Sequence, residues 1–481
     1  MTISSALSNA MTGLQAAGRT SEIISANLAN AMTPGYGVRN LSISSSQIGG
    51  VSVNGVIRNV DPSLLADVRL AEAAFSNASD RTNFLTNYES VLGTPDEENS
   101  LSARLAEFES TLISASSRPD APERLQLVAN AAKDIVNVIT AASDEVQQSR
   151  TDADRQIQIQ VDLLNSSLEN VKELNSQITR TAVSGGDISA LLDSRQAVVD
   201  QISSIVPVRQ VPRENGQVAL YSTGGAILLD GGVAEIEFTA VNQVTPYMTM
   251  EDGTLSGLTL NGYPIRTDSQ SGALGGGSLG AQFEIRDELG THAQSQLDAL
   301  SRDLVERFQD PAVDPTLLAG DAGIFTDAGI AFDPVNETGL AARLAINAAV
   351  DESQGGEAWR IRDGINALTP GEAGDSSLLL TLSDAFTATR VPASGEFGSG
   401  ALSATNLVST LTSQLGAERY QAEKVLSFSS SQFDELTQQL LADGVDTDQE
   451  LQRLILVEQA YAANVRMIEA VDEMMQAILR I

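Results

Sequence analysis

A chain of 481 residues can form two to four domains, each large enough to bury a hydrophobic core. Its formal net charge of −34 argues against nucleic acid and anionic membranes as partners, because binding phosphate groups requires clustered Lys and Arg. The sequence has no cysteine, which excludes disulfides, thiolate metal sites and cysteine nucleophiles.

The N-terminal stretch predicts a helix with a heptad seam. Apolar and small residues alternate there in steps of four and three, the spacing of a coiled coil: Ile3, Leu7, Ala10, Leu14, Ala17, Ser21, Ile24, Leu28 and Ala31. The pattern ends at Thr33-Pro34-Gly35, because proline disfavours helix at the preceding residue and glycine follows into a turn. The small seam residues permit a second helix to approach closely.

The sequence next predicts a hairpin and two helices. Residues 41–60 are rich in Ser, Gly and Val, which favours a short hairpin or an extended linker. Asp61 and Pro62 start a helix that runs to Leu92, and a second helix spans residues 101–115.

The longest helical pattern covers residues 121–182 and contains two apolar seams. Residues 147–156 between the seams are polar, and the second seam is displaced by four residues, the size of a stutter in a coiled coil. Either one long helix passes over a solvent gap here or two helices meet. Long antiparallel helix packing explains this pattern better than a cofactor site does.

The middle of the chain changes period. A short helix is predicted over residues 188–205, and the apolar period then becomes two over residues 207–265, with glycine-rich turns, which predicts a small β-rich module. Helix resumes over residues 279–308. Residues 310–400 are acidic and interrupted by Gly and Pro, and they predict no clear element. Residues 402–441 are helical again, so helices on both sides enclose the β module and the chain folds back on itself.

The C-terminal residues 446–481 predict one unbroken helix of about 45 Å. Thr447 and Glu450 have the spacing of a capping box at its start. Apolar residues then keep to one side: Leu454, Val457, Tyr461, Val465, Ile468, Val471, Met475 and Ile478. Heptad helices at both ends suggest that the termini pair with each other or with other copies. Periodicity alone also fits a buried C-terminal helix of an ordinary domain.

Each end also carries a short motif. The C-terminal motif combines Gly444-Val445-Asp446 with Gln459-Ala460-Tyr461 and Asn464, and the N-terminal motif contains Asn27, Asn30, Thr33, Pro34, Gly35 and Tyr36. Both are similar to the signatures of the bacterial flagellar rod, hook and hook-associated axial protein family. After Tyr36 the chain reads Gly-Val-Arg, where the hook-associated protein 1 branch more usually has Ser-Arg or Thr-Arg. The ends therefore indicate the family but not the branch.

Motifs in the middle indicate the branch. Residues 190–196 follow a long coiled segment and resemble the Leu-Leu-Asp-x-Arg region of hook-associated protein 1. Residues 276–280 resemble its Gly-Gly-x-Leu-Gly element before a helix, and residues 344–347 are a looser match to a Leu-x-Val-Asn element. Rod and hook proteins lack the long coiled segment, so a flagellar rod or hook subunit is the second interpretation.

No group of residues predicts catalysis. Gly275 to Gly280 match the G-x-G-x-x-G pattern, which makes a nucleotide-binding protein the alternative of another class. No hydrophobic strand precedes this loop and no βαβ series follows it, so the glycines are better explained as turn formers. His292 is the sole histidine, which argues against a zinc site. Asp443, Asp446, Asp448 and Glu450 could suggest calcium, but the glycine at the required loop position and the later bidentate glutamate of an EF-hand are missing. We therefore expect no enzyme activity, no cofactor and no metal.

The predicted fold is mainly α with a β-rich insertion. Its domains are a terminal helical domain for the polymer core (1–60 with 446–481), a long-helix bundle (61–205 with 279–309 and 401–445), a β-rich outer module (206–278) and an acidic α+β region (310–400). The acidic residues lie almost wholly in the middle, so the near-neutral ends can enter a packed assembly.

The resemblance implies a structural subunit that joins the flagellar hook to the filament. Its partners would be itself in a ring or helical layer, the hook protein, the second hook-associated junction protein and an export chaperone. The sequence shows no signal peptide and no segment long enough to span a bilayer, which alone fits a cytoplasmic protein. The resemblance instead implies export through the flagellar type III channel without a cleaved peptide. The expected assembly interface is Ile3, Leu7, Leu14, Ile24, Leu28, Leu454, Tyr461, Val465, Ile468, Met475 and Ile478.

Overall fold

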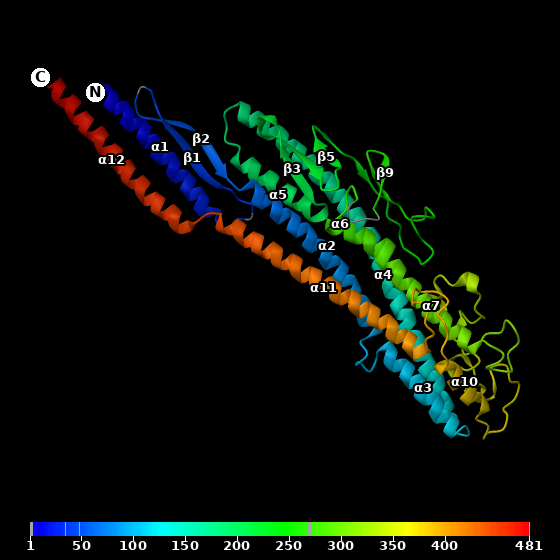
Figure 1. Ribbon diagram of the computed structural model, residues 1–481. Coiled ribbons are helices and arrows are strands. Elements are labelled where there is room, and N and C mark those ends of the chain that lie inside the picture. The colour runs from blue at the N-terminus through cyan, green and yellow to red at the C-terminus, as the bar shows by residue number, and fades with distance from the viewer. Residues whose placement is uncertain (1–2, 34, 48, 268–271, 481) are drawn as a thin grey trace.

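The computed structural model describes residues 3–33, 35–47, 49–267 and 272–480. Long helices run side by side in an elongated molecule, with both chain ends at one tip and α3 and α10 at the other (Figure 1). Small sheets lie along one side of the helices. This arrangement confirms the predicted fold, mainly α with a β-rich insertion.

Helices from the two ends of the chain form an antiparallel pair, called the terminal pair below. It consists of α1 (Ile3–Ala29) and α12 (Thr447–Leu479), which lie next to each other in Figure 1. Gly13 allows close approach, because a Cβ atom there would lie 2.9 Å from the side chain of Asn464. α1 ends at Ala29, before the predicted last seam residue, and a turn follows. The antiparallel strands β1 (Val38–Ser45) and β2 (Val51–Asn59) form the predicted hairpin.

The predicted capping box at the start of α12 is wrong. The N-cap is Asp446, whose carboxylate accepts hydrogen bonds from the backbone N–H groups of Asp448 and Gln449, both at 3.0 Å. Thr447 is already the first helical residue. Glu450 is buried and bonds to Arg453 instead, at 3.1 Å.

Residues 61–445, called the body below, pack around two hydrophobic cores. The terminal pair together with the β1–β2 hairpin is called the terminal part. The first core, at the tip far from the termini, contains buried residues of six long helices: α2 (Pro62–Leu92), α3 (Leu101–Ser117), α4 (Pro122–Val183), α7 (Gly290–Phe308), α10 (Ser377–Thr387) and α11 (Ala404–Ala442). Asp61 caps α2, as predicted, by accepting from the N–H groups of Ser63 and Leu64. α11 runs alongside α2 for most of its length (Figure 1).

The second core contains α5 (Ser189–Ile205), α6 (Gly277–Glu284), the second half of α4 and the predicted β module. Strands β3 to β6 form one antiparallel sheet and β7 to β9 another. The bounds of these strands are Val208–Pro212, Val218–Ser222, Ile227–Asp230, Gly232–Val233, Ile236–Glu237, Leu258–Leu260 and Tyr263–Ile265.

α4 is one continuous helix that contributes to both cores, and its polar middle is not a solvent gap. Arg150 is 1% exposed and donates to the carbonyl oxygens of Arg286 at 2.8 Å and Met248 at 2.9 Å. The buried Asp154 bonds to the Arg286 guanidinium at 2.7 Å and to the N–H of Val241 at 2.7 Å. The displaced register therefore marks the place where a π-helix (Ile285–Leu289) and the β module bind α4 through polar groups.

The acidic segment 310–400 covers the first core with short elements. These are β10 (Phe325–Asp327), α8 (Leu340–Arg343), β11 (Leu344–Ile346), α9 (Arg360–Asp363) and α10. The Phe108 ring of α3 lies 5.8 Å from that of Phe325 and 5.3 Å from that of Phe386. Trp359 is half-buried against the same core. Elements of three or four residues are too short to produce a readable period, which is why the sequence predicts nothing clear here.

The glycines before α6 serve packing. Gly276 and Gly277 have φ angles of 82° and 61°, and a Cβ atom on Gly277 would lie 2.3 Å from the carbonyl oxygen of Ile205. The end of α5 therefore occupies the space that a phosphate would need against this backbone, which argues against the nucleotide-binding alternative. None of the described helices is long and apolar enough to cross a membrane.

Candidate assembly surface and its joint to the body

α12 exposes large apolar side chains along much of its length. They are between 44% and 85% exposed and comprise Leu451, Ile455, Leu456, Tyr461, Met467, Met474, Met475, Ile478 and Leu479. Neither α1 nor α12 contributes a residue to the two cores of the body. Soluble monomers rarely leave so long an apolar row in water, so this surface has the composition of an interface. We call it the α12 face.

The predicted seam residues occupy different positions on the terminal pair. Ile24 is buried. Leu7 lies beside Ile468 and Met475 at a cavity of about 260 Å³ between the helices. Tyr461, Met475 and Ile478 are exposed, and the half-buried seam residues are Ile3, Leu7, Leu14, Leu28, Leu454, Val465 and Ile468. That these residues form an assembly interface stays a prediction.

Sequence reasoning missed part of the α12 face. Leu456, Met467 and Met474 lie outside the predicted seam and are more exposed than Met475 within it. The signal was present, because Met467 and Met474 repeat at heptad spacing. A helix with two adjacent apolar stripes can cover one with its partner helix and leave the other for a different molecule.

The N-terminal signature forms a tight loop after α1. Asn27 is fully buried, and its side-chain oxygen accepts hydrogen bonds from the Tyr36 hydroxyl at 2.8 Å and the Arg39 N–H at 3.1 Å. Its amide nitrogen donates to the Arg39 carbonyl at 2.9 Å. One side chain thus ties the helix to the first strand. The Arg39 guanidinium lies 4.8 Å from the centre of the Tyr36 ring.

The other signature residues support the same loop. Asn30 donates to the carbonyl of Ala26 at 2.9 Å and accepts from the Thr33 hydroxyl at 3.3 Å. Gly35 has a φ of 77°, a conformation that favours glycine. Pro34 lies outside the described residues. Burial raises the pKa of the Tyr36 hydroxyl, and the nearby Asp193 acts in the same direction.

The N-terminal signature loop and the Leu-Leu-Asp-x-Arg motif of α5 are far apart in the sequence but meet at one carboxylate. Asp193, from the Leu-Leu-Asp-x-Arg motif on α5, accepts from the N–H of Gly37 at 3.1 Å, Nη2 of Arg39 at 2.7 Å and Nε of Arg58 at 2.6 Å. Arg58 also donates to Gln196 on the next turn of α5. The charge pairs link the hairpin to the body and had no sequence signal, because more than a hundred residues separate the partners.

The remainder of the α5 motif is held inside the body. Arg195 donates to Asn175 at 2.8 Å and to the Gly216 carbonyl at 2.7 Å. Burial lowers its pKa to about 10, and the nearby Arg58 and Arg69 act in the same direction. Asp200 pairs with Arg69 of α2 at 2.6 Å. α5 is therefore a rigid base for Asp193.

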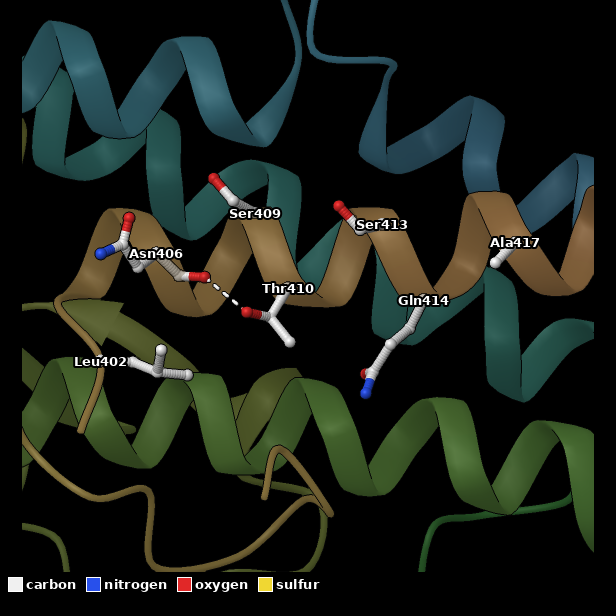
Figure 2. A pocket seen from close by; sticks show the side chains of 7 residues that line it. All are labelled: Leu402, Asn406, Ser409, Thr410, Ser413, Gln414 and Ala417. Atoms are coloured by element: carbon white, nitrogen blue, oxygen red, sulfur yellow. Dashed lines mark hydrogen bonds between the residues drawn. The ribbon is translucent and has the colours of Figure 1, made fainter. Parts of the chain in front are cut away.

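Two further cavities lie outside the terminal pair. One, of about 350 Å³, lies at the joint between the signature loop and the linker from α11 to α12. The other is a shallow groove of about 520 Å³ along α11, lined by residues of that helix and by Leu402 just before it (Figure 2). Its lining is small and uncharged, and Figure 2 shows the Thr410 hydroxyl donating to the Asn406 carbonyl at 2.8 Å. The titratable residues lining the first cavity are Tyr36, Asp61 and Asp443, of which Tyr36 is bonded to Asn27 and Asp61 caps α2.

The residues weighed for metal binding are dispersed. Among the described residues, no three His, Cys, Asp or Glu side chains are placed to hold a metal ion. His292 is partly exposed, and its Nδ1 lies 3.7 Å from a carboxylate oxygen of Glu396. The acidic residues at the start of α12 surround its N-terminus, where the helix dipole favours negative charge.

Comparison with known families assigns both the ends and the middle of the chain. The helical domain of the flagellar hook-associated protein FlgK matches residues 85–323, about half of the chain. The C-terminal region of the flagellar basal body rod FlgEFG proteins matches residues 437–481, which include α12. The flagella basal body rod protein family matches residues 7–36, which contain most of α1 and the signature loop.

Individual relatives agree with these matches. Flagellar hook-associated protein 1 of Bacillus subtilis is 22% identical over 489 residues, covering 94% of this chain and 93% of that protein. The Escherichia coli protein of the same name is 26% identical over 291 residues, 56% of this chain and 52% of that protein. The Salmonella typhimurium protein is 28% identical over 247 residues, 48% and 44% of the two chains. The chain thus spans about half the length of the enterobacterial relatives.

A solved structure, the flagellar hook junction protein FlgK from Burkholderia pseudomallei, has a TM-score of 0.45 and 19% sequence identity. It covers 55% of this chain and 47% of that one. The matched helical domain, the two terminal matches and the near full-length alignment with the B. subtilis relative lead to one assignment: the chain belongs to the flagellar hook-associated protein 1 family.

Proposed function

We propose that this chain is a structural subunit of the bacterial flagellum, that it joins the hook to the filament, and that it acts without catalysis. The α12 face is the observation that carries the proposal. The terminal pair stands at one tip of the molecule and exposes an apolar row that the described part of its own chain does not cover. Membership of a family of structural flagellar proteins supports the same conclusion.

Assembly would bury the α12 face. Each square ångström of apolar surface removed from water contributes about 25 cal/mol, so burying half-exposed Leu, Ile and Met side chains favours association. The partners in this proposal are other copies in a ring or helical layer, the hook protein and the second hook-associated junction protein, with an export chaperone before assembly. The proposed location is the flagellum, outside the cell.

Electron microscopy of a deletion strain tests this proposal. Loss of the gene should leave hooks of normal length without filaments, and a plasmid copy should restore the filaments. A plasmid copy that lacks residues 447–481 should fail to restore them although the body is produced. Cells without hooks would instead assign the chain to the rod or the hook. Normal filaments in the deletion strain would exclude a flagellar junction altogether.

A further inference from the structure

The joint between the terminal pair and the body has little apolar packing. Neither hydrophobic core includes a residue of the β1–β2 hairpin, and neither strand has a buried residue. A cavity of about 350 Å³ lies between the signature loop and the α11–α12 linker. Two short segments connect the parts covalently, from Asn59 to Pro62 and from Ala442 to Thr447. Packing therefore leaves the angle between the two parts weakly determined.

Hydrogen bonds to a charged group connect the two parts where apolar packing is sparse. The Asp193 carboxylate holds three points of the terminal part, the loop at Gly37 and one arginine on each strand. These charged side chains are between 13% and 18% exposed, so water screens them less than it screens a surface pair. Three bonds from different directions fix an orientation, whereas a single ion pair would permit rotation about it.

Gly37 is part of the same device. A Cβ atom at this position would lie 2.5 Å from Nε of Arg58, the atom that bonds to Asp193. The absence of a side chain at position 37 lets Arg58 lie across the loop, where it also donates to the Gly35 carbonyl at 3.3 Å. This contact gives a physical reason for the Tyr-Gly-Val-Arg sequence after the signature.

We infer that Asp193 is the positioning residue of the joint, and that it sets the direction of the terminal pair relative to the body. The inference rests on the proposed function for its consequence, because a fixed angle matters when the terminal pair is built into a polymer and the body projects from it. The angle between the hairpin and the body is a property of the single chain, and the terminal pair takes its direction from the hairpin once assembly orders α1 and α12.

Distance measurements between spin labels on the monomeric full-length protein test this inference. The chain has no native cysteine, so Ser52→Cys on β2 and Ala197→Cys on α5 give two unique and exposed attachment sites. The labelled parent should give one narrow distance distribution. Asp193→Asn keeps the shape of the side chain and removes its charge, and it should broaden the distribution. Amide exchange in β1 and β2 should accelerate about tenfold or more, because bonds to a charged group are lost.

Matched variants separate positioning from general damage. Asp327→Asn removes a buried carboxylate that pairs with Arg343 within the body, away from the joint, and it should leave the label distribution narrow. Gly37→Ala displaces Arg58 but keeps Arg39, so its effect should be intermediate. Asp193→Glu keeps the charge and should restore part of the narrow distribution. An unchanged distribution in Asp193→Asn, or equal broadening in Asp327→Asn, would overturn the inference.

The same variants, tested in the deletion strain, distinguish a failure of this inference from a failure of the proposed function. If Asp193 acts as inferred, the Asp193→Asn variant should give fewer or unstable filaments in the complemented deletion strain, and Asp327→Asn should give normal ones. A broad distribution in the monomer together with a deletion strain that forms normal filaments would refute the flagellar function and leave the joint intact as a finding. A narrow distribution in Asp193→Asn refutes the joint whatever the cells show.

Discussion

The terminal pair and the helix α4 have similar heptad patterns, yet their apolar residues end in different surroundings. Seam residues of α4 such as Ile139 and Leu164 are fully buried between other helices and sheets of the same chain. Met474 and Ile478 of α12 are about half exposed. The same periodicity therefore occurs where the apolar side chains are buried within the chain and where they are exposed to solvent.

A heptad seam therefore predicts a helix, but it does not predict which chain buries the apolar side of that helix. α4 contacts α2, α3, α5, α6 and α7, so that elements close in around its apolar residues. α12 has α1 and little else beside it (Figure 1). The body can be stable alone, whereas the terminal pair requires neighbours to bury its remaining apolar surface.

Among the proposed substitutions, Ile468→Asp should have the largest effect, because it should prevent assembly while the body stays folded. Ile468 lies beside Leu7, where a carboxylate would be buried without a partner once neighbours cover the helix, and such a charge is heavily penalised. We expect polymer formation to be abolished, measured by electron microscopy and by complementation. The melting transition of the body should stay within a few degrees of the parent.

Leu127→Asp is the matched control for that variant, because Leu127 is an exposed apolar residue of the body, 53% accessible on α4. It should leave assembly unchanged. If the Ile468→Asp variant still assembles, the seam of α12 is not an interface.

Hydrogen exchange on the monomer should show the next largest contrast. Backbone ordering costs about 1–2 kcal/mol per residue, and a lone pair of helices with few buried side chains does not offset this cost. We therefore predict that α1 and α12 exchange nearly unprotected in the monomer and become protected on assembly. The segment of α4 from Leu125 to Ile178 should be protected in both states. Strong protection of both terminal helices in the monomer would contradict this expectation.

A cavity-forming substitution in the body should lower the stability of the body itself. Ile139→Ala removes a fully buried side chain from the first core and should destabilise the body by about 2–5 kcal/mol in calorimetry. Ile468→Ala is the matched truncation in the terminal pair, and it should leave the body transition unchanged while weakening the polymer. Equal losses of body stability in the two variants would show that the terminal pair and the body unfold as one unit.

Periodicity made the helices predictable from sequence. The bounds of α2, α3, α5 and α11 were expected within a few residues, because Asp61-Pro62 at one start and Arg118-Pro119 after α3 are strong local signals. The β module was also predictable, since the period changes to two beyond Pro207. Local chemistry determines such elements, and local chemistry is what a sequence displays.

Pairing of the two terminal helices was among the expectations from sequence, but the polar contacts between distant segments were not predictable. Nothing near Asp193 in the sequence indicates that Arg39 and Arg58 bind it, and nothing near Gln147 to Gln156 indicates a buried Arg150 and Asp154. A polar stretch in a helix reads as solvent-exposed unless the partner segment is known. The joint and the polar contacts of α4 are therefore results of tertiary structure alone.

The N-cap of α12 supplies the smallest predicted effect. Thr447 and Glu450 have the spacing of a capping box, but the backbone places the cap one residue earlier, so that Asp446 accepts the two N–H groups. Asp446→Ala should cost about 1 kcal/mol of helix stability, the usual loss for an N-cap carboxylate. Because α12 is expected to fold fully only in the polymer, the loss should appear as a lower denaturant concentration for polymer dissociation. Asp446→Asn should retain most of the stability, since asparagine caps almost as well, and Thr447→Ala should change little. A larger loss from Thr447→Ala than from Asp446→Ala would place the cap at Thr447 in the assembled state, and α12 would then begin one residue later there than it does in the single chain.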